Sequence, residues 1–333
     1  MIGSILDLRR RGVMGLNERN VLLVNEFNPR RLIRLVNDKT VTKRLAAEAG
    51  IPTPELYGTI SNAFDMRRLT DLISAPDGAV IKPANGAQGN GILVIAEKVQ
   101  SGWRLASGRR LTYEDIKFHT NNILSGMHSL SGQPDTAMVE ARVRFDDVFS
   151  DVSFQGVPDI RVIVLRGLPL VAMVRLPTAA SDGKANLHKG GVGVGLDLAT
   201  GLTQLGMQNG KMIDSHPDTA HALSGIQVPH WDEMLLMAAR AYDVTGLGYL
   251  GADIVLDREK GPLLLELNAR PGISIQIANR AGLKPHVDAA LAADIEGLDA
   301  SARVERAKAI YRDVVGEPGA PDAAEETAKS AAA

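Results

Sequence analysis

The chain of 333 residues contains no cysteine, which excludes disulfide bonds, thiolate metal sites and a cysteine nucleophile. It also lacks any apolar run approaching the ~20 residues that cross a bilayer, so no membrane span is expected. The first fifteen residues, MIGSILDLRRRGVMG, place their charges after a very short apolar piece, the reverse of a secretory signal. These absences predict a cytoplasmic location.

The chain as a whole also lacks an excess of charge of one sign. Its 37 Lys and Arg residues nearly balance 39 Asp and Glu residues, so it shows no global basic surplus of the kind that nucleic-acid binders carry. Residues 1–44 differ, with ten basic and four acidic residues, including Arg9 to Arg11 and Arg30, Arg31 and Arg34. A solvated basic face is the favoured interpretation, and a contact for an anionic ligand or partner is the alternative.

The length and the 45% hydrophobic content allow a substantial core in two or three lobes. Short strand-like runs alternate with helical stretches, as in α+β proteins. We expect a short basic segment over 1–38, a small lobe over 39–138 and a large lobe over 139–300. The last helix is expected at about 284–297. Residues 301–333 are expected to end a helix and continue as an Ala/Pro/Glu-rich tail, disordered from about Gly316.

The stretch GADIVLDREKGPLLLELNARPG, residues 251–272, predicts a hairpin that turns between Asp257 and Pro262. Counting outward from a symmetric turn places Asp253 opposite Glu266, and strand alternation puts Asn268 on the face of Glu266. Opposed like charges are destabilising unless something positive lies between them, and two carboxylates with an amide oxygen suit Mg²⁺. We favour a metal site over a solvent-facing polar face with accidental spacing.

A second stretch, VIKPANGAQGNGILVI at residues 80–95, reads as strand, glycine loop and strand. Rossmann and P-loop sites need a helix directly after the loop, so both are excluded. A glycine hairpin can still lie over phosphates and donate backbone N–H groups. Lys82, at the end of the first strand, is a point charge that could reach a phosphate. A plain bulged hairpin is the alternative.

In a third stretch, Asp159 and Arg161 share one face at the start of a strand, and Arg175 lies near the end of the next strand. The following loop, over 184–195, contains four glycines and the polar residues Asn186, His188 and Lys189. Cationic and amide donors on flexible backbone suit a site where negative charge builds up. A surface histidine is the alternative for His188.

Taken in order, several stretches resemble the ATP-grasp superfamily and, within it, the RimK-like alpha-L-glutamate ligases, with the closest match to the alpha-L-glutamate ligase-related group. They are NDKTVTKRLAAEAGIPTPE, VIKPANGAQGNGI, VEARV, DIRVIVL, NLHKGG, GADIV and GPLLLELNARPG, which together span about residues 37–300. The resemblance implies an α+β ATP-grasp fold whose two lobes hold ATP between them. A shortened N-terminal segment stands where related ligases usually carry a complete domain.

The resemblance also implies roles for single residues. It places ATP against Lys39, Lys82, the lid residues Gly86, Gln88, Gly89 and Gly91, the linker residues Glu140, Ala141 and Val143, and Asp159. It implies that Arg161, Arg175, Asn186 and His188 face phosphates or reacting groups. It implies that Asp253, Glu266 and Asn268 bind Mg²⁺. Two ions are expected, and Mn²⁺ is an alternative metal. Arg270 stands at the position after the Asn-Ala pair where related ligases often carry a small residue. This extra cation suggests an anionic substrate group.

The function that the resemblance implies is ATP-dependent ligation of a carboxylate to an amine through an acyl phosphate, adding glutamate or another amino acid. The expected partners are a small-molecule or peptide carboxylate and an amine acceptor. The oligomeric state is left open, and a homo-oligomer is one of the possibilities. Two alternatives stay open as well: a kinase that phosphorylates a hydroxyl, and a non-catalytic nucleotide-binding scaffold.

Overall fold

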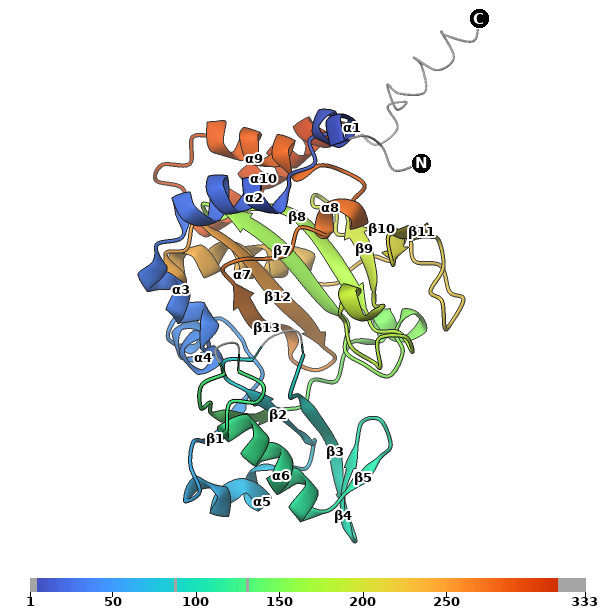
Figure 1. Ribbon diagram of the computed structural model, residues 1–333. Coiled ribbons are helices and arrows are strands. Elements are labelled where there is room, and N and C mark those ends of the chain that lie inside the picture. Colours follow the sequence, from blue (N-terminus) through green and yellow to red (C-terminus); the bar gives the residue numbers. More distant parts are fainter. Residues whose placement is uncertain (1–4, 87–88, 130–131, 317–333) are drawn as a thin grey trace, which may run out of the picture.

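The computed structural model describes residues 5–86, 89–129 and 132–316, which form two lobes, each built on one antiparallel sheet (Figure 1). The small lobe carries a six-stranded sheet in the order β1-β6-β2-β3-β4-β5. Its strands are β1 (Leu56–Ile60), β2 (Ala79–Pro83), β3 (Leu93–Val99), β4 (Gly102–Leu105), β5 (Arg110–Leu111) and β6 (Ala137–Ala141).

The small sheet buries one face under short helices. These are η2 (Asp65–Arg68), α5 (Leu69–Leu72) and α6 (Tyr113–Leu124). Alternate residues of β2, such as Ala79 and Ile81, pack with Ile116 and Ile123 of α6 in one apolar cluster, as strand and helix periodicities require. A capping box at Thr112 begins α6.

The large lobe carries a seven-stranded sheet in the order β11-β10-β9-β8-β7-β12-β13. Its strands are β7 (Asp159–Leu165), β8 (Leu168–Leu176), β9 (Val192–Leu196), β10 (Thr203–Gln208), β11 (Lys211–Ile213), β12 (Tyr249–Asp257) and β13 (Gly261–Asn268). Two short helices, η3 (Asp147–Val152) and η4 (Leu187–Lys189), lie in its loops. The hairpin β12–β13 at the edge of the order carries the acidic residues singled out in the sequence.

The two faces of the large sheet have different covers (Figure 1). Val162, Val174 and Ile254 pack in one cluster with α7 (Trp231–Thr245). Ile163 and Tyr249 point to the other face, under elements from both ends of the chain. Those elements include η1 (Asn20–Asn25), α8 (Ile275–Ala278) and α9 (Leu283–Ala292), while α10 (Ala300–Val315) contributes to both clusters. Two short helices, α1 (Ile5–Arg10) and α2 (Leu16–Arg19), precede η1. The part of this second face nearest the small lobe is polar.

Two further helices, α3 (Arg30–Asn37) and α4 (Lys39–Glu48), lead from the large lobe to the small one. The helix predicted after Asp38 is confirmed, since the Asp38 side chain accepts a hydrogen bond from the Thr40 N–H at 2.9 Å. The helix predicted before Gly246 is confirmed as well. Gly246 caps α7 at φ +67°, a left-handed conformation that glycine adopts without steric cost.

The prediction of one last helix at 284–297 is wrong. Helix α9 ends at Ala292, and α10 begins after Asp299, whose carboxylate accepts a hydrogen bond from the Ala302 N–H at 2.8 Å. This Asp cap was the signal that the sequence offered for a new helix. The predicted tail beyond Gly316 lies outside the described residues, and the three boundaries between the four predicted segments stay predictions. No helix in the described ranges is long and apolar enough to cross a membrane.

His286 makes the fold sensitive to acid. It is 2% exposed on α9 and stacks on Tyr311 of α10, with ring centroids 5.6 Å apart. Burial lowers the pKa of His286 from 6.5 to about 4. Between these two values the unfolded chain binds a proton that the folded chain excludes, so stability falls as the pH falls.

We expect His286→Phe to remove this loss. Between pH 7 and pH 4, wild type should lose about 3 kcal/mol more unfolding free energy than His286→Phe, since each unit of pKa shift is worth 1.36 kcal/mol. Urea unfolding at several pH values measures the difference. His221→Phe is the control, because His221 is exposed and its replacement should leave the acid sensitivity intact. Equal slopes in wild type and His286→Phe would contradict the assignment.

Candidate active site

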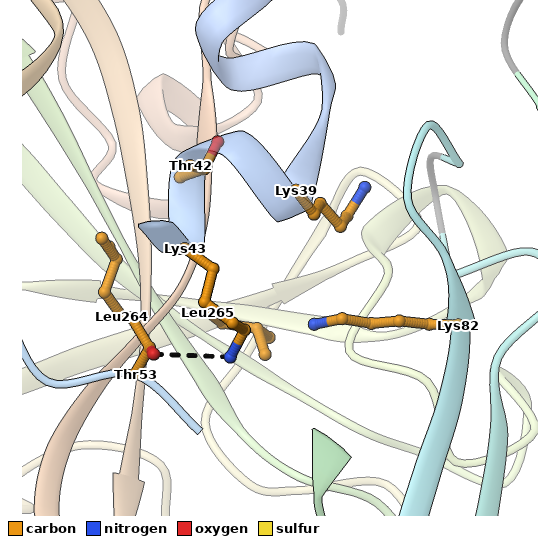
Figure 2. A pocket seen from close by; sticks show the side chains of 7 residues that line it. All are labelled: Lys39, Thr42, Lys43, Thr53, Lys82, Leu264 and Leu265. Carbon is orange, nitrogen blue, oxygen red and sulfur yellow. Dashed lines mark hydrogen bonds between the residues drawn. The ribbon is translucent and has the colours of Figure 1, made fainter. Parts of the chain in front are cut away.

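A small pocket, partly open to solvent, lies where the two lobes meet. Figure 2 shows three lysine side chains around it, two from α4 and one from β2, with β13 forming the opposite wall. Its lining residues are Lys39, Thr42, Lys43, Thr53, Lys82, Leu264 and Leu265. The pocket therefore gathers positive charge from both lobes against an apolar wall.

Lys39, the first residue of α4, links the glycine turn of the small lobe to the large sheet. Its backbone N–H donates to the Ala84 carbonyl at 3.1 Å, which fixes the start of α4 against the end of β2. Its Nζ donates to the Gly86 carbonyl at 2.5 Å and lies 3.6 Å from Oε2 of Glu266. This one ammonium group thus touches both lobes.

Lys82 and Lys43 share one buried carboxylate. The Nζ of Lys82 lies 2.5 Å from Oε1 of Glu140, and the Nζ of Lys43 lies 3.1 Å from Oε2. Burial lowers the pKa of Lys43, while the charge of Glu140 opposes that shift. Sequence reasoning missed Lys43, although its spacing of four from Lys39 places both side chains on one face of a helix. The three ammonium groups of the pocket thus meet two carboxylates, Glu140 and Glu266, and the one positive charge in excess suits a polyphosphate.

The predicted pair of Asp253 and Glu266 is confirmed, but the reason given for it is wrong. The turn of the hairpin is one residue shorter than expected, because Asp257 pairs with Gly261 and not with Pro262. A β-bulge at Leu265 then shifts the register, so that Asp253 again faces Glu266. Such bulges re-aim side chains next to active sites. Here the bulge brings consecutive residues, Leu264 and Leu265, to the pocket while Glu266 joins the polar face.

Asp253 is 1% exposed and lies at the centre of a hydrogen-bonded cluster. Arg161, opposite it on β7, donates from Nε to Oδ1 at 2.7 Å and from Nη2 to Oδ2 at 2.5 Å. Arg175 on β8 donates from Nη2 to Asp253 Oδ2 at 2.8 Å and binds both carboxylate oxygens of Asp159. The amide of Asn268 donates to Asp253 at 3.2 Å and to Glu266 at 3.3 Å.

The two buried carboxylates of this cluster titrate differently. Burial raises the pKa of Asp253, but the guanidinium groups of Arg161 and Arg175 outweigh it and hold that pKa far below its usual range. Burial raises the pKa of Asp159 to about 6 against the opposing charge of Arg175, and the charge of Asp253 adds to the rise. Asp253 therefore stays ionised, whereas Asp159 takes up a proton in mildly acidic solution.

The donor set can be tested against the predicted Mg²⁺. Within the described residues, no group of three or more His, Cys, Asp or Glu could hold a metal ion, so an amide oxygen must take part. Oδ2 of Asp253 already accepts three hydrogen bonds and Oδ1 accepts one, which leaves a lone pair on Oδ1. The carboxylate of Glu266, 29% exposed, is a hard-oxygen ligand. Asn268 donates from its amide nitrogen to both carboxylates here, so its amide would have to turn over for the oxygen to join the ligand set. The residues fit Mg²⁺, and the assignment stays a prediction.

The structure places the remaining predicted residues in different surroundings. Gly86 binds Lys39, Gly89 and Gly91 have positive φ angles, and Gln88 lies outside the described residues. Asn186 accepts a hydrogen bond from the His188 N–H at 2.9 Å. Their loop reaches the glycine turn, where Lys189 donates to Asn90 at 2.8 Å. A last group of predicted residues consists of Ala141, Val143, His188 and Arg270. In the described ranges, no hydrogen bond or ion pair joins any of them to the acidic cluster, the hydrogen-bonded group around Asp253.

Asp253 and Glu266 should differ in how much they contribute to stability. Asp253→Ala leaves the largely buried Arg161 without a carboxylate and Arg175 with Asp159 alone, so we expect it to lower the unfolding free energy by about 3 kcal/mol or more. Glu266→Ala breaks one partly exposed ion pair and should cost less than about 1 kcal/mol. Urea unfolding in EDTA measures both changes. Equal costs for the two variants would show that the arginines do not depend on Asp253.

Comparisons with known proteins give the family. The model of the sugar-transfer associated ATP-grasp family matches residues 18–291. A probable alpha-L-glutamate ligase of Xanthomonas oryzae pv. oryzae (strain MAFF 311018) is 27% identical over 247 residues, which cover 74% of this chain and 61% of the relative. The chain therefore spans about three fifths of that protein's length.

Solved structures show weaker likeness. The ATP-grasp ligase PsnB, complexed with a minimal precursor, is 16% identical, with a TM-score of 0.42 over 80% of this chain and 63% of PsnB. D-alanine–D-alanine ligase from Bacillus anthracis is 14% identical, with a TM-score of 0.41 over 84% of this chain and 68% of the ligase. The family match covers most of the chain and confirms the resemblance and the fold class predicted from the sequence. The chain belongs to the sugar-transfer associated ATP-grasp family.

Proposed function

We propose that the protein is an ATP-dependent ligase that joins a carboxylate to an amine through an acyl phosphate. The observation that supports this most directly is the meeting of three lysines from both lobes with a buried carboxylate–arginine cluster. Family membership supports ATP as the nucleotide. An ATP-consuming reaction fits the cytoplasm, which is the location we propose.

The proposed reaction has two steps. A carboxylate oxygen of the substrate attacks the γ-phosphorus, the bond between the γ-phosphorus and the β–γ bridging oxygen breaks, and ADP leaves. The amine nitrogen then attacks the acyl carbon, the carbon–oxygen bond to the phosphoryl group breaks, and phosphate leaves as the amide forms. The amine proton passes to solvent. No covalent protein intermediate is required, which agrees with a chain that lacks cysteine.

The residues of the site would bind and orient the phosphates. Lys39 and Lys82 point into the pocket from opposite lobes and would hold phosphate oxygens. Arg161 and Arg175 are fixed by their carboxylate partners, so their charge is already oriented when the reaction begins. Bound Mg²⁺, which Glu266 and Asn268 would hold with Oδ1 of Asp253, supplies neutralisation of phosphate charge.

The class of substrate is proposed from the relatives. The relatives named as probable alpha-L-glutamate ligases make glutamate the first candidate for the added group. Peptide and small-molecule carboxylates are the first candidates for the activated partner. Arg270, exposed just beyond Asn268, favours substrates that carry a negative charge.

Purified protein with ATP, Mg²⁺ and mixtures of amino acids and peptides should release ADP only when a carboxylate is present. Hydroxylamine should trap the acyl phosphate as a hydroxamate, and mass spectrometry should detect the amide product. ADP release that depends on a hydroxyl substrate, with a stable phosphoester as product, would replace ligation by kinase activity. Nucleotide binding without turnover under every substrate condition would favour a scaffold.

Two variants test the site within that assay. Lys82→Ala and Glu266→Gln should each lower kcat/KM by about 100-fold or more. Lys82→Ala removes positive charge from the phosphate oxygens, and Glu266→Gln weakens the proposed Mg²⁺ site. Glu259→Gln, an exposed residue in the turn of the same hairpin, is the control and should retain activity. Full activity in Glu266→Gln would refute the metal assignment.

A further inference from the structure

We infer that Arg19 and Arg270 form a binding site for an anionic group of the substrate, a carboxylate or a phosphate, beside the acidic cluster. The inference rests on the proposed function only in assigning the anion to the substrate. It would make the N-terminal segment part of the active site, in line with the alternative of an anionic ligand contact that its basic composition left open.

Arg19 is a buried cation without a counter-ion. It lies at the end of α2, is 6% exposed, and donates from Nη1 to the Pro271 carbonyl at 2.7 Å. Its Nε is buried and has no hydrogen-bond partner. In the part of the chain described here, the other buried basic side chains each have a carboxylate partner: Lys82, Arg303 and Lys308. An unpaired buried charge is costly, so Arg19 is suited to a partner that comes from outside the chain.

Arg270 adds a second guanidinium group next to Pro271, the residue that Arg19 contacts. Arg270 is exposed, and no ion pair involves it among the described residues. Burial lowers the pKa of Arg19, and the nearby charge of Arg270 lowers it further. Two like charges brought together without an acid between them favour an anion there, and guanidinium groups bind carboxylates and phosphates with two hydrogen bonds each.

The strand geometry places this pair next to the acidic cluster. Pro271 packs against Gly251, where an added Cβ would come within 2.8 Å of the Pro271 ring. Gly251 pairs with Asn268 and lies between Asp253 and Tyr249 on one face of β12. An anion held at Pro271 would therefore lie beside Gly251, which is the neighbour of Asp253 on that face of β12.

Tyr249 connects the two regions. Its side chain is fully buried and its hydroxyl has no hydrogen-bond partner. Burial raises the pKa of Tyr249 to about 12, and the charges of Arg19 and Arg161 both oppose that rise. The Tyr249 hydroxyl is therefore a second buried donor without a partner, on the face of β12 that also carries Gly251 and Asp253.

The test is thermal unfolding of the full chain without ATP, in sodium phosphate or sodium L-glutamate against sodium chloride at equal ionic strength. At ten times its Kd, a bound anion should raise Tm by roughly 3 °C. Arg270→Gln should abolish the rise, and Arg312→Gln, an exposed arginine on α10, should keep it. A rise in Tm in phosphate alone would identify the bound group of the substrate as a phosphate. A rise in glutamate alone would identify it as a carboxylate.

Lys82→Ala separates this site from the proposed triphosphate site and should keep the rise in Tm. Loss of the rise in Lys82→Ala alone would overturn the inference, as would a full rise in Arg270→Gln or no rise in wild type. Because this measurement uses no ATP, a failure of ligase activity leaves its result intact, and the reverse also holds.

Arg19 needs its own variants because its replacement can disturb packing. Arg19→Gln should lose the rise in Tm that the anion causes, whatever its Tm in chloride. Arg19→Lys keeps the charge and should retain part of the rise. A structural role alone would change Tm equally in all three salts, and that result would remove Arg19 from the site.

Discussion

The structure around the site depends on the pairing of buried charges between different strands. Asp253 is almost fully buried, yet it stays ionised because Arg161 from β7 and Arg175 from β8 both bind it. A carboxylate in this position without those partners would be neutral or would not be buried at all. The hydrogen bonds also fix both guanidinium groups, so the large lobe presents positive charge in a set orientation. That constraint explains why three neighbouring strands each carry charged residues at the same level of the sheet.

The same principle joins the lobes. Glu140 of the small sheet holds Lys82 and Lys43, while Lys39 reaches from the glycine turn to Glu266 of the large sheet. The Lys39–Glu266 contact is partly exposed and long, so it contributes little to stability. The Lys82–Glu140 pair is buried and close. Both charges have given up water, so removing either partner would leave the other buried and unpaired. Of the ion pairs that Lys39, Lys43 and Lys82 make at this junction, the Lys39–Glu266 pair is therefore the weakest. A phosphate entering there would compete with carboxylates for lysines that are already in place.

The sequence predicted the chemistry-bearing residues better than the way the chain brings them together. Alternation on strands correctly placed Asp253 and Glu266 opposite one another, but through a symmetric turn, whereas the bulge at Leu265 produces that register. A bulge depends on local strand packing, which no spacing rule in one sequence reports. Lys43 could have been found from its helical spacing to Lys39. Arg19 could not, because its importance comes from a missing partner, and that is visible only once the fold shows what surrounds it.

Charge balance links the two ends of the site. At the pocket, three lysines meet Glu140 and Glu266, and in the cluster, two arginines meet Asp159 and Asp253. The cluster is therefore neutral while Asp159 is ionised, and the pocket has one positive charge in excess. Arg19 and Arg270 have no acidic partner in the described chain, so positive charge also remains at the far side of the cluster. A neutral, rigid centre between two positive ends suits a reaction whose two partners both arrive as anions, a nucleotide on one side and a charged substrate on the other.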